Sequence, residues 1–264
     1  MANENKSDTS SEDGGSVIGV LASLVLMTIV VRGCDFATPK ANITATSEIV
    51  NNTDEFVDKN ATIRSRPIQK VGLSSFTVSD ARFFRGEPIV VVNASGVPFN
   101  LPVDENTQIQ VTGRVRNLVI PEIERQFKLK LQDKYYTDYI NKPAIIARYI
   151  TLAPKPGQVT QRPEQYYGRR VTVTGEVGNI RSPILLTLDE DQLLGGKDLP
   201  VLFKAPPKVA VNEGQTVSVI GEVRPFVVAE IERDYDLTWD LNVKKQLEVE
   251  YANKPVLVAE TVYP

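Results

Sequence analysis

The chain carries one sequence pattern twice. The first copy has QVTGRV at 110–115, IPEIER at 120–125 and NKP at 141–143, and the second has SVIGEV at 218–223, VAEIER at 228–233 and NKP at 253–255. Gly113 and Gly221 are 108 positions apart, and so are Glu122 and Glu230. Repeats of solenoid proteins are much shorter, about 20–50 residues. The pattern therefore predicts a duplicated domain.

The length of 264 residues leaves room for two domains of about 100 residues behind a short N-terminal segment. We expect the first domain at 55–154, a linker at 155–162 and the second domain at 163–264. Residues 54–154 hold 14 Lys/Arg against 11 Asp/Glu, whereas residues 163–264 hold 11 against 16. Two ordinary solvated surfaces explain this difference, but so do halves that attract each other or meet different partners.

The chain has no histidine and one cysteine. This excludes a disulfide within one chain, histidine acid–base chemistry, Ser–His or Cys–His nucleophiles and His-ligated metals. The sequence also shows no nucleophile–base pair and no glycine-rich phosphate loop. We therefore expect a protein that is not an enzyme and that has no cofactor.

The N-terminus is typical of membrane attachment. Residues 1–13 are polar and acidic, and residues 14–31 carry no charge. Eighteen helical residues extend about 27 Å, just enough to cross a bilayer core. An uncleaved anchor helix fits best. A buried core helix is less suitable, because no polar stripe interrupts the apolar run. A cleaved signal is less suitable, because such signals usually begin with basic residues and this chain begins with acidic ones.

Cys34 offers another form of attachment, because the preceding Val31 and Gly33 suit a bacterial lipoprotein cleavage box, although Arg32 does not. The following stretch, 32–54, reads as a flexible linker, and it overlaps a spacer rich in Asn, Thr and Ala at 35–61. The position of the apolar segment favours export of the domains. We expect a membrane-anchored protein with extracytoplasmic domains.

Both copies show the alternation of β-strands. The clearest strand is 170–177, where Val171, Val173 and Gly175 share one face. Five strands are predicted in each copy: 62–71, 76–79, 89–92, 107–115 and 143–150 in the first, and 170–177, 184–188, 199–203, 215–223 and 255–262 in the second.

The predicted fold class is all-β with short helical insertions: two tandem OB-like five-stranded barrels behind an N-terminal membrane helix. Glycines inside strands often mark bends or bulges at barrel corners, and Gly113, Gly175 and Gly221 suit that role. A five-stranded sandwich is the alternative. Between the fourth and fifth strands, each copy inserts about 30 residues, for which a short helix is expected and a strand also fits.

Three segments carry a family resemblance: 167–177, 187–191 together with Gly195 and Gly196, and 229–236. In them the chain resembles an uncharacterised, largely cyanobacterial family of membrane-attached proteins with tandem OB-like domains. The resemblance covers roughly residues 55–264 and implies the fold and the membrane segment. It implies no activity, cofactor or catalytic residue.

The candidate sites are few. A basic patch that could bind a ligand or nucleic acid consists of Arg82, Phe83, Phe84, Arg85, Arg114 and Arg116. Asp189, Glu190 and Asp191 are candidate metal ligands, but three adjacent acids do not form the shaped loop that hard cations need. In the repeated Glu-Ile-Glu-Arg motif, we expect Arg125 and Arg233 to pair with nearby carboxylates and to hold each insertion against its barrel.

These observations favour a membrane-tethered, non-enzymatic binding or scaffold protein for an unknown protein or small ligand. The alternative is a nucleic-acid-binding protein facing the cytoplasm. The net acidic second domain and the membrane tether argue against nucleic acid as the partner.

Overall fold

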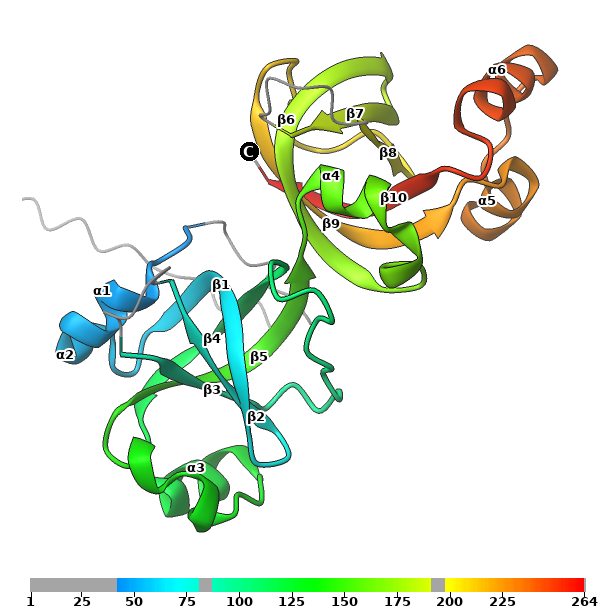
Figure 1. Cartoon of the computed structure of the whole chain (residues 1–264). Coiled ribbons are helices and arrows are strands. Elements are labelled where there is room, and N and C mark those ends of the chain that lie inside the picture. The colour runs from blue at the N-terminus through cyan, green and yellow to red at the C-terminus, as the bar shows by residue number, and fades with distance from the viewer. Residues whose placement is uncertain (1–41, 81–86, 191–197, 264) are drawn as a thin grey trace, which may run out of the picture. The chain divides into compact units, whose positions relative to one another are not determined.

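The computed structural model describes residues 42–80, 87–190 and 198–263. This part of the chain is mostly β with short helices (Figure 1). The first copy contains β1 (Asn60–Val71), β2 (Ser75–Ser79), β3 (Ile89–Asn93), β4 (Gln108–Asn117) and β5 (Pro143–Ala153). The second copy contains β6 (Arg170–Ser182), β7 (Leu185–Asp189), β8 (Leu199–Phe203), β9 (Thr216–Pro225) and β10 (Pro255–Tyr263).

Each copy closes into a five-stranded barrel. In the first, β1 pairs with β2 and β4, β3 pairs with β2 and β5, and β4 pairs with β5. The second repeats this circuit with β6–β7, β7–β8, β8–β10, β10–β9 and β9–β6. In each barrel one pair is parallel, β3–β5 or β8–β10. The predicted five-stranded barrels are thus confirmed, and the sandwich alternative is wrong.

The two parallel strand pairs are covered on both faces. Val91 and Ile145 point into the first barrel, whereas Val90, Val92 and Ile146 join a second apolar cluster outside it. That outer cluster is completed by the insertion between β4 and β5, which contains α3 (Ile120–Phe127). The second barrel has a matching outer cluster under α5 (Val228–Tyr235) and α6 (Leu241–Tyr251). Burial on both faces explains why these strands read as continuous apolar runs.

The repeated glycines stand where two strands come unusually close. The β4–β5 register shifts between Thr112 and Gly113, and the β9–β10 register shifts opposite Gly221. A Cβ on Gly113 would lie 2.7 Å from the Cα of Ala147, and one on Gly221 would lie 2.9 Å from the carbonyl carbon of Val258. Bulges of this kind sharpen the bend that closes a barrel. Gly175 also lies against backbone, with 2.7 Å from a would-be Cβ to the Asp189 carbonyl oxygen.

The repeated Asn-Lys-Pro motif closes each insertion. Asn141 and Asn253 adopt left-handed backbone conformations, with φ of 64° and 58°. Asparagine tolerates this region better than most residues. The Asn141 N–H donates to the Leu118 carbonyl, and the Asn253 N–H donates to the Phe226 carbonyl. Each motif ends on the proline that opens β5 or β10, so the sequence repeat reflects a shared backbone turn.

Several segments differ from the sequence-based expectations or lie outside the described residues. The expected linker 155–162 contains α4 (Pro156–Gln161), whose Val159 is fully buried in the core. Part of the expected spacer forms α1 (Thr46–Asn51) and α2 (Thr53–Phe56), because Ile49 is fully buried in the barrel core. α6 was not expected. The membrane segment 14–31 and Cys34 lie outside the described residues. Within 42–80, 87–190 and 198–263, no helix is long and apolar enough to cross a bilayer.

Candidate ligand-binding site

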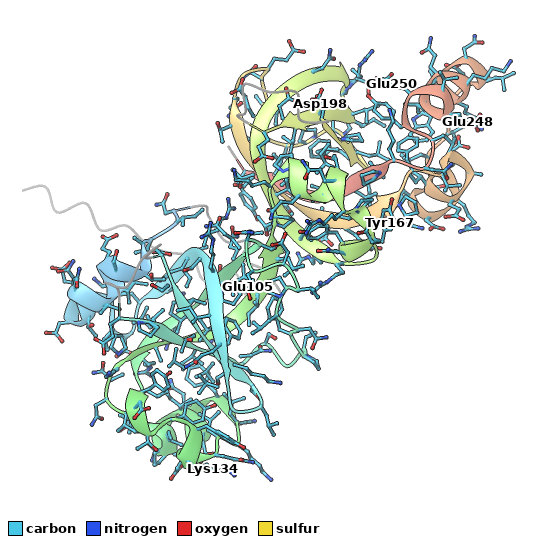
Figure 2. The ribbon with its side chains drawn as sticks, in the orientation of Figure 1. Glu105, Lys134, Tyr167, Asp198, Glu248 and Glu250 are labelled. Carbon is cyan, nitrogen blue, oxygen red and sulfur yellow. The ribbon has the colours of Figure 1, made fainter. Side chains whose placement is uncertain are left out.

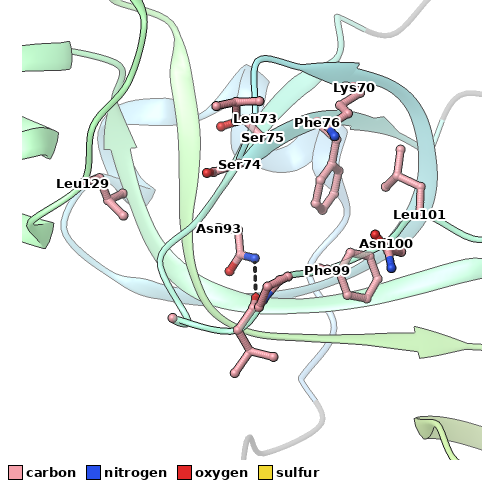
Figure 3. Close-up of a pocket in the computed structure, with 13 residues that line it drawn as sticks. Lys70, Leu73, Ser74, Ser75, Phe76, Asn93, Phe99, Asn100, Leu101 and Leu129 are labelled. Atoms are coloured by element: carbon pink, nitrogen blue, oxygen red, sulfur yellow. Dashed lines mark hydrogen bonds between the residues drawn. The ribbon is translucent and has the colours of Figure 1, made fainter.

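A pocket with a volume of about 550 Å³ opens on the first barrel (Figure 3). It lies between the β1–β2 turn, the start of β2, the end of β3 and the loop that follows β3, with one residue from the β4–β5 insertion. Its volume is within the range of small-molecule sites. The lining residues are Lys70, Leu73, Ser74, Ser75, Phe76, Asn93, Gly96, Val97, Pro98, Phe99, Asn100, Leu101 and Leu129.

The pocket has an aromatic and aliphatic wall. Phe76 belongs to the barrel core and is 4% exposed. The rings of Phe76 and Phe99 lie 5.9 Å apart and are tilted, a common geometry for aromatic pairs. Phe99 and Leu101 are partly buried against the same core. Leu73 and Val97 lie at the rim and are 79% and 67% exposed. An apolar group entering the pocket would therefore meet side chains that the barrel already holds in place.

The polar groups of the pocket have distinct tasks. The Ser75 hydroxyl lies 2.8 Å from the Tyr136 hydroxyl, and burial raises the pKa of Tyr136 above its usual value. The Asn93 amide holds the loop, since its nitrogen donates to the Val97 carbonyl and its oxygen accepts from Ser95. Lys70 is exposed, and it is the only charged side chain among the described residues that line the pocket. A bound carboxylate or phosphate would find its counter-charge there.

The second barrel differs at the same strand positions. The registers place Val201 and Leu257 where the first barrel has Val91 and Ile145. Counting from these pairs, Leu186 corresponds to Phe76, and Phe203 corresponds to Asn93. Phe203 is 5% exposed and belongs to the barrel core. A large apolar side chain thus fills in the second barrel the position that a polar loop-ordering residue has in the first.

The structure describes only Arg114 and Arg116 of the predicted basic patch, because Arg82, Phe83, Phe84 and Arg85 lie outside the described residues. Arg116 forms an ion pair with Asp58 and donates to Gln126, so it is engaged within its own barrel. Arg114 lies on the outer face of β4, opposite Asn60. Neither Arg114 nor Arg116 lines the pocket.

The predicted metal ligands are divided. Asp189 ends β7, Glu190 pairs with Lys155 at 2.8 Å, and Asp191 lies outside the described residues. No group of three potential metal ligands occurs within the described ranges. Burial raises the pKa of Asp189 to about 6, and the nearby Asp198 (Figure 2) and Glu176 add to the increase. This carboxyl is therefore disfavoured in its charged form by the fold.

The structure predicts a pH effect from Asp189. Its pKa rises from 3.8 to about 6 on folding, so its stabilising effect is complete below about pH 4 and is lost as the pH rises through about 6. We expect Asp189→Asn to be more stable than the wild type at pH 7.5 and little changed at pH 4. Urea unfolding at both values measures this, with the exposed Asp133→Asn as control. An equal effect at both values would contradict it.

In the repeated Glu-Ile-Glu-Arg motif, the second glutamate has a structural role, because it accepts a backbone hydrogen bond in each copy. Glu124 accepts a hydrogen bond from the Leu131 N–H at 2.6 Å, and Glu232 accepts one from the Trp239 N–H at 3.0 Å. The expected pairing with a carboxylate occurs for one of the two arginines. Arg233, 72% exposed, pairs with the adjacent Asp234, whereas Arg125 is exposed and forms no ion pair with the described residues. The isoleucines Ile123 and Ile231 supply the contact with the barrels.

The chain matches no protein-family model and no curated protein sequence. The case for a site thus depends on geometry. Sequence analysis missed the pocket, because its wall is divided between a strand and an irregular loop that has no periodic pattern. The one sequence signal for the pocket is that Asn93 in the first copy corresponds to Phe203 in the second. That correspondence becomes visible only when the strand registers are known.

Proposed function

We propose that this protein is a non-enzymatic binding protein whose ligand site is the pocket of the first barrel. The main support is a difference between the two copies. The first has a cavity lined by Phe76, Phe99 and Leu101, whereas the second has the buried Phe203 at the position of Asn93. A duplicated fold that differs at this position suits one binding unit and one supporting unit.

The proposal assigns both barrels to the OB-like class. The support is the circuit of strands, in which the third strand pairs with the fifth and the first with the fourth, as in a five-stranded Greek-key barrel. OB folds bind ligands near the second and third strands and at the first and fourth loops. The pocket involves β2, β3, the β1–β2 turn and Leu129 of the β4–β5 insertion.

The proposal also places the protein at a membrane, through residues 14–31 or through a lipid on Cys34, with the barrels outside the cytoplasm. Its support is the uncharged run of 18 residues and the resemblance to membrane-attached proteins. Protease added to intact cells is expected to cleave an epitope tag at the C-terminus. Protection of that tag, with cleavage after cell lysis, would contradict the extracytoplasmic location.

The ligand proposed for the pocket has an apolar or aromatic group for Phe76 and Phe99 and an anionic end for Lys70. Indole-3-propionate has both parts and serves as a probe. We expect residues 39–264, which form one compact unit, to bind it, and Asn93→Phe to weaken the binding at least about tenfold, equal to about 1.4 kcal/mol. Isothermal titration calorimetry measures both affinities.

The matched control is Val209→Phe, which adds the same side chain to the equivalent loop of the second barrel, where Val209 is 42% exposed. It should leave the affinity unchanged. Thermal unfolding establishes that both variants fold. Unchanged binding by a folded Asn93→Phe variant would contradict the pocket as the site. Binding of single-stranded oligonucleotide in its place would favour the nucleic-acid alternative, which has less support because Arg116 is already paired.

A further inference from the structure

The same outer face of the two barrels carries opposite charge. The registers pair Asn60 with Arg114 in the first barrel and Arg170 with Glu222 in the second, so Arg114 and Glu222 are equivalent. Each lies one residue after the glycine of the bulge. Each bulge leaves one residue without a partner in the register, and this residue is Arg148 in β5 and Glu260 in β10. Two arginines in one copy thus correspond to two glutamates in the other.

A third reversal lies on the first strand of each barrel. Stepping along β1 and β6 from Asn60 and Arg170, Arg66 corresponds to Glu176, and Arg64 corresponds to Thr174. We call Arg66, Arg114 and Arg148 the basic face, and Glu176, Glu222 and Glu260 the acidic face.

Most of these charges are not neutralised. The Arg114 and Arg148 side chains form no ion pair with the described residues, and neither does Glu222. Glu260 pairs with Arg170 at 2.7 Å, but both side chains remain about half exposed. Arg64 is different: it is engaged within the chain, where it donates to Gln110 and to Thr174. The remaining like charges on each face repel one another until a face of opposite charge approaches.

We propose that the basic face of one chain binds the acidic face of a second copy of this chain. Charge complementarity favours this partner, because each chain carries both a basic face and an acidic face at equivalent positions of its two barrels. Tyr149, 39% exposed and paired in register with Thr112, adds an aromatic group to the basic face. The contact joins two different surfaces. Two chains can therefore form a dimer that contains this contact twice, or several chains can form a closed ring.

The test exchanges the charges. Variant one is Arg114→Glu with Arg148→Glu, which makes both faces acidic. Variant two is Glu222→Arg with Glu260→Arg, which makes both faces basic. The full chain is kept in non-ionic detergent, and sedimentation velocity is measured in 50 and 500 mM NaCl. We expect the wild type to associate at low salt and to dissociate at high salt, because salt screens exposed charges.

Each variant alone should be monomeric at low salt, and an equimolar mixture of the two should associate again. Lys130→Glu with Lys134→Glu makes the same charge change on the insertion and should associate like the wild type. A wild type that stays monomeric at 50 mM NaCl, or a mixture that does not associate, overturns the proposal. So does salt-dependent binding of a single-stranded oligonucleotide that variant one abolishes while the protein remains monomeric. This test is independent of the pocket.

Discussion

Replacement of Gly221 by valine is expected to unfold the second barrel. A side chain there would overlap the Val258 carbonyl oxygen, and its Cβ would lie 3.0 Å from the Cα of Ala259. Both obstacles are backbone of the neighbouring strand, so no rotamer change relieves the overlap. Overpacking in a core typically costs about 1–3 kcal/mol and occasionally more. We expect the upper end or beyond, with loss of the cooperative transition in urea unfolding followed by circular dichroism.

Gly96→Ala calibrates this effect. A Cβ at Gly96 has no atom within 4 Å, and its φ of +77° costs about 1–2 kcal/mol for a residue with a side chain. This variant should therefore stay folded. Gly113→Val should behave like Gly221→Val, because Gly113 has the same position in the first barrel. If Gly221→Val lowered stability no more than Gly96→Ala, the close strand crossing would be wrong.

Truncation of Phe226 to alanine is expected to loosen the helical insertion of the second barrel. Phe226 is 1% exposed and lies between Trp239, with ring centroids 6.5 Å apart, and Tyr251, at 5.6 Å. Phe→Ala in a core costs about 3–5 kcal/mol. Trp239 is the one tryptophan of the chain, so its fluorescence reports this cluster directly. We expect a red-shifted emission and an earlier unfolding midpoint.

Val249→Ala is the matched control, since Val249 lies on α6 and is 89% exposed. Surface substitutions of this kind usually change stability by less than about 0.5 kcal/mol. A Phe226→Ala protein with unchanged Trp239 emission would show that the insertion does not depend on this packing.

The sequence predicted the barrels because their determinants are local and occur twice. Each determinant can be recognised within a few residues of sequence: the alternating valines, the bulge glycines and the Asn-Lys-Pro turn. The helices α1 and α2 were missed because polar residues surround one fully buried apolar residue, Ile49, and the partly buried Val50 and Phe56. The 11-residue α6 was missed because its exposed face includes apolar residues such as Leu241 and Val249, which obscure the helical pattern.

The candidate site was beyond sequence analysis for a different reason. The pocket depends on how the loop after β3 folds back over Phe76, and that path follows from contacts such as Asn93 with Val97. The charge-reversed faces depend on register: Arg148 and Glu260 become equivalent only when each bulge is placed. Net charge indicated the asymmetry between the halves, but strand pairing was needed to locate it.

The central claim is that the first barrel binds a ligand and the second does not. The direct measurement is a titration of ¹⁵N-labelled residues 39–264 with indole-3-propionate, followed by backbone amide chemical shifts. The account predicts shifts concentrated at residues 70–76 and 93–101, with the equivalent strand ends and loop of the second barrel, residues 180–186 and 203–211, unchanged. Shifts concentrated at 180–186 and 203–211, or equal in the two barrels, would contradict it.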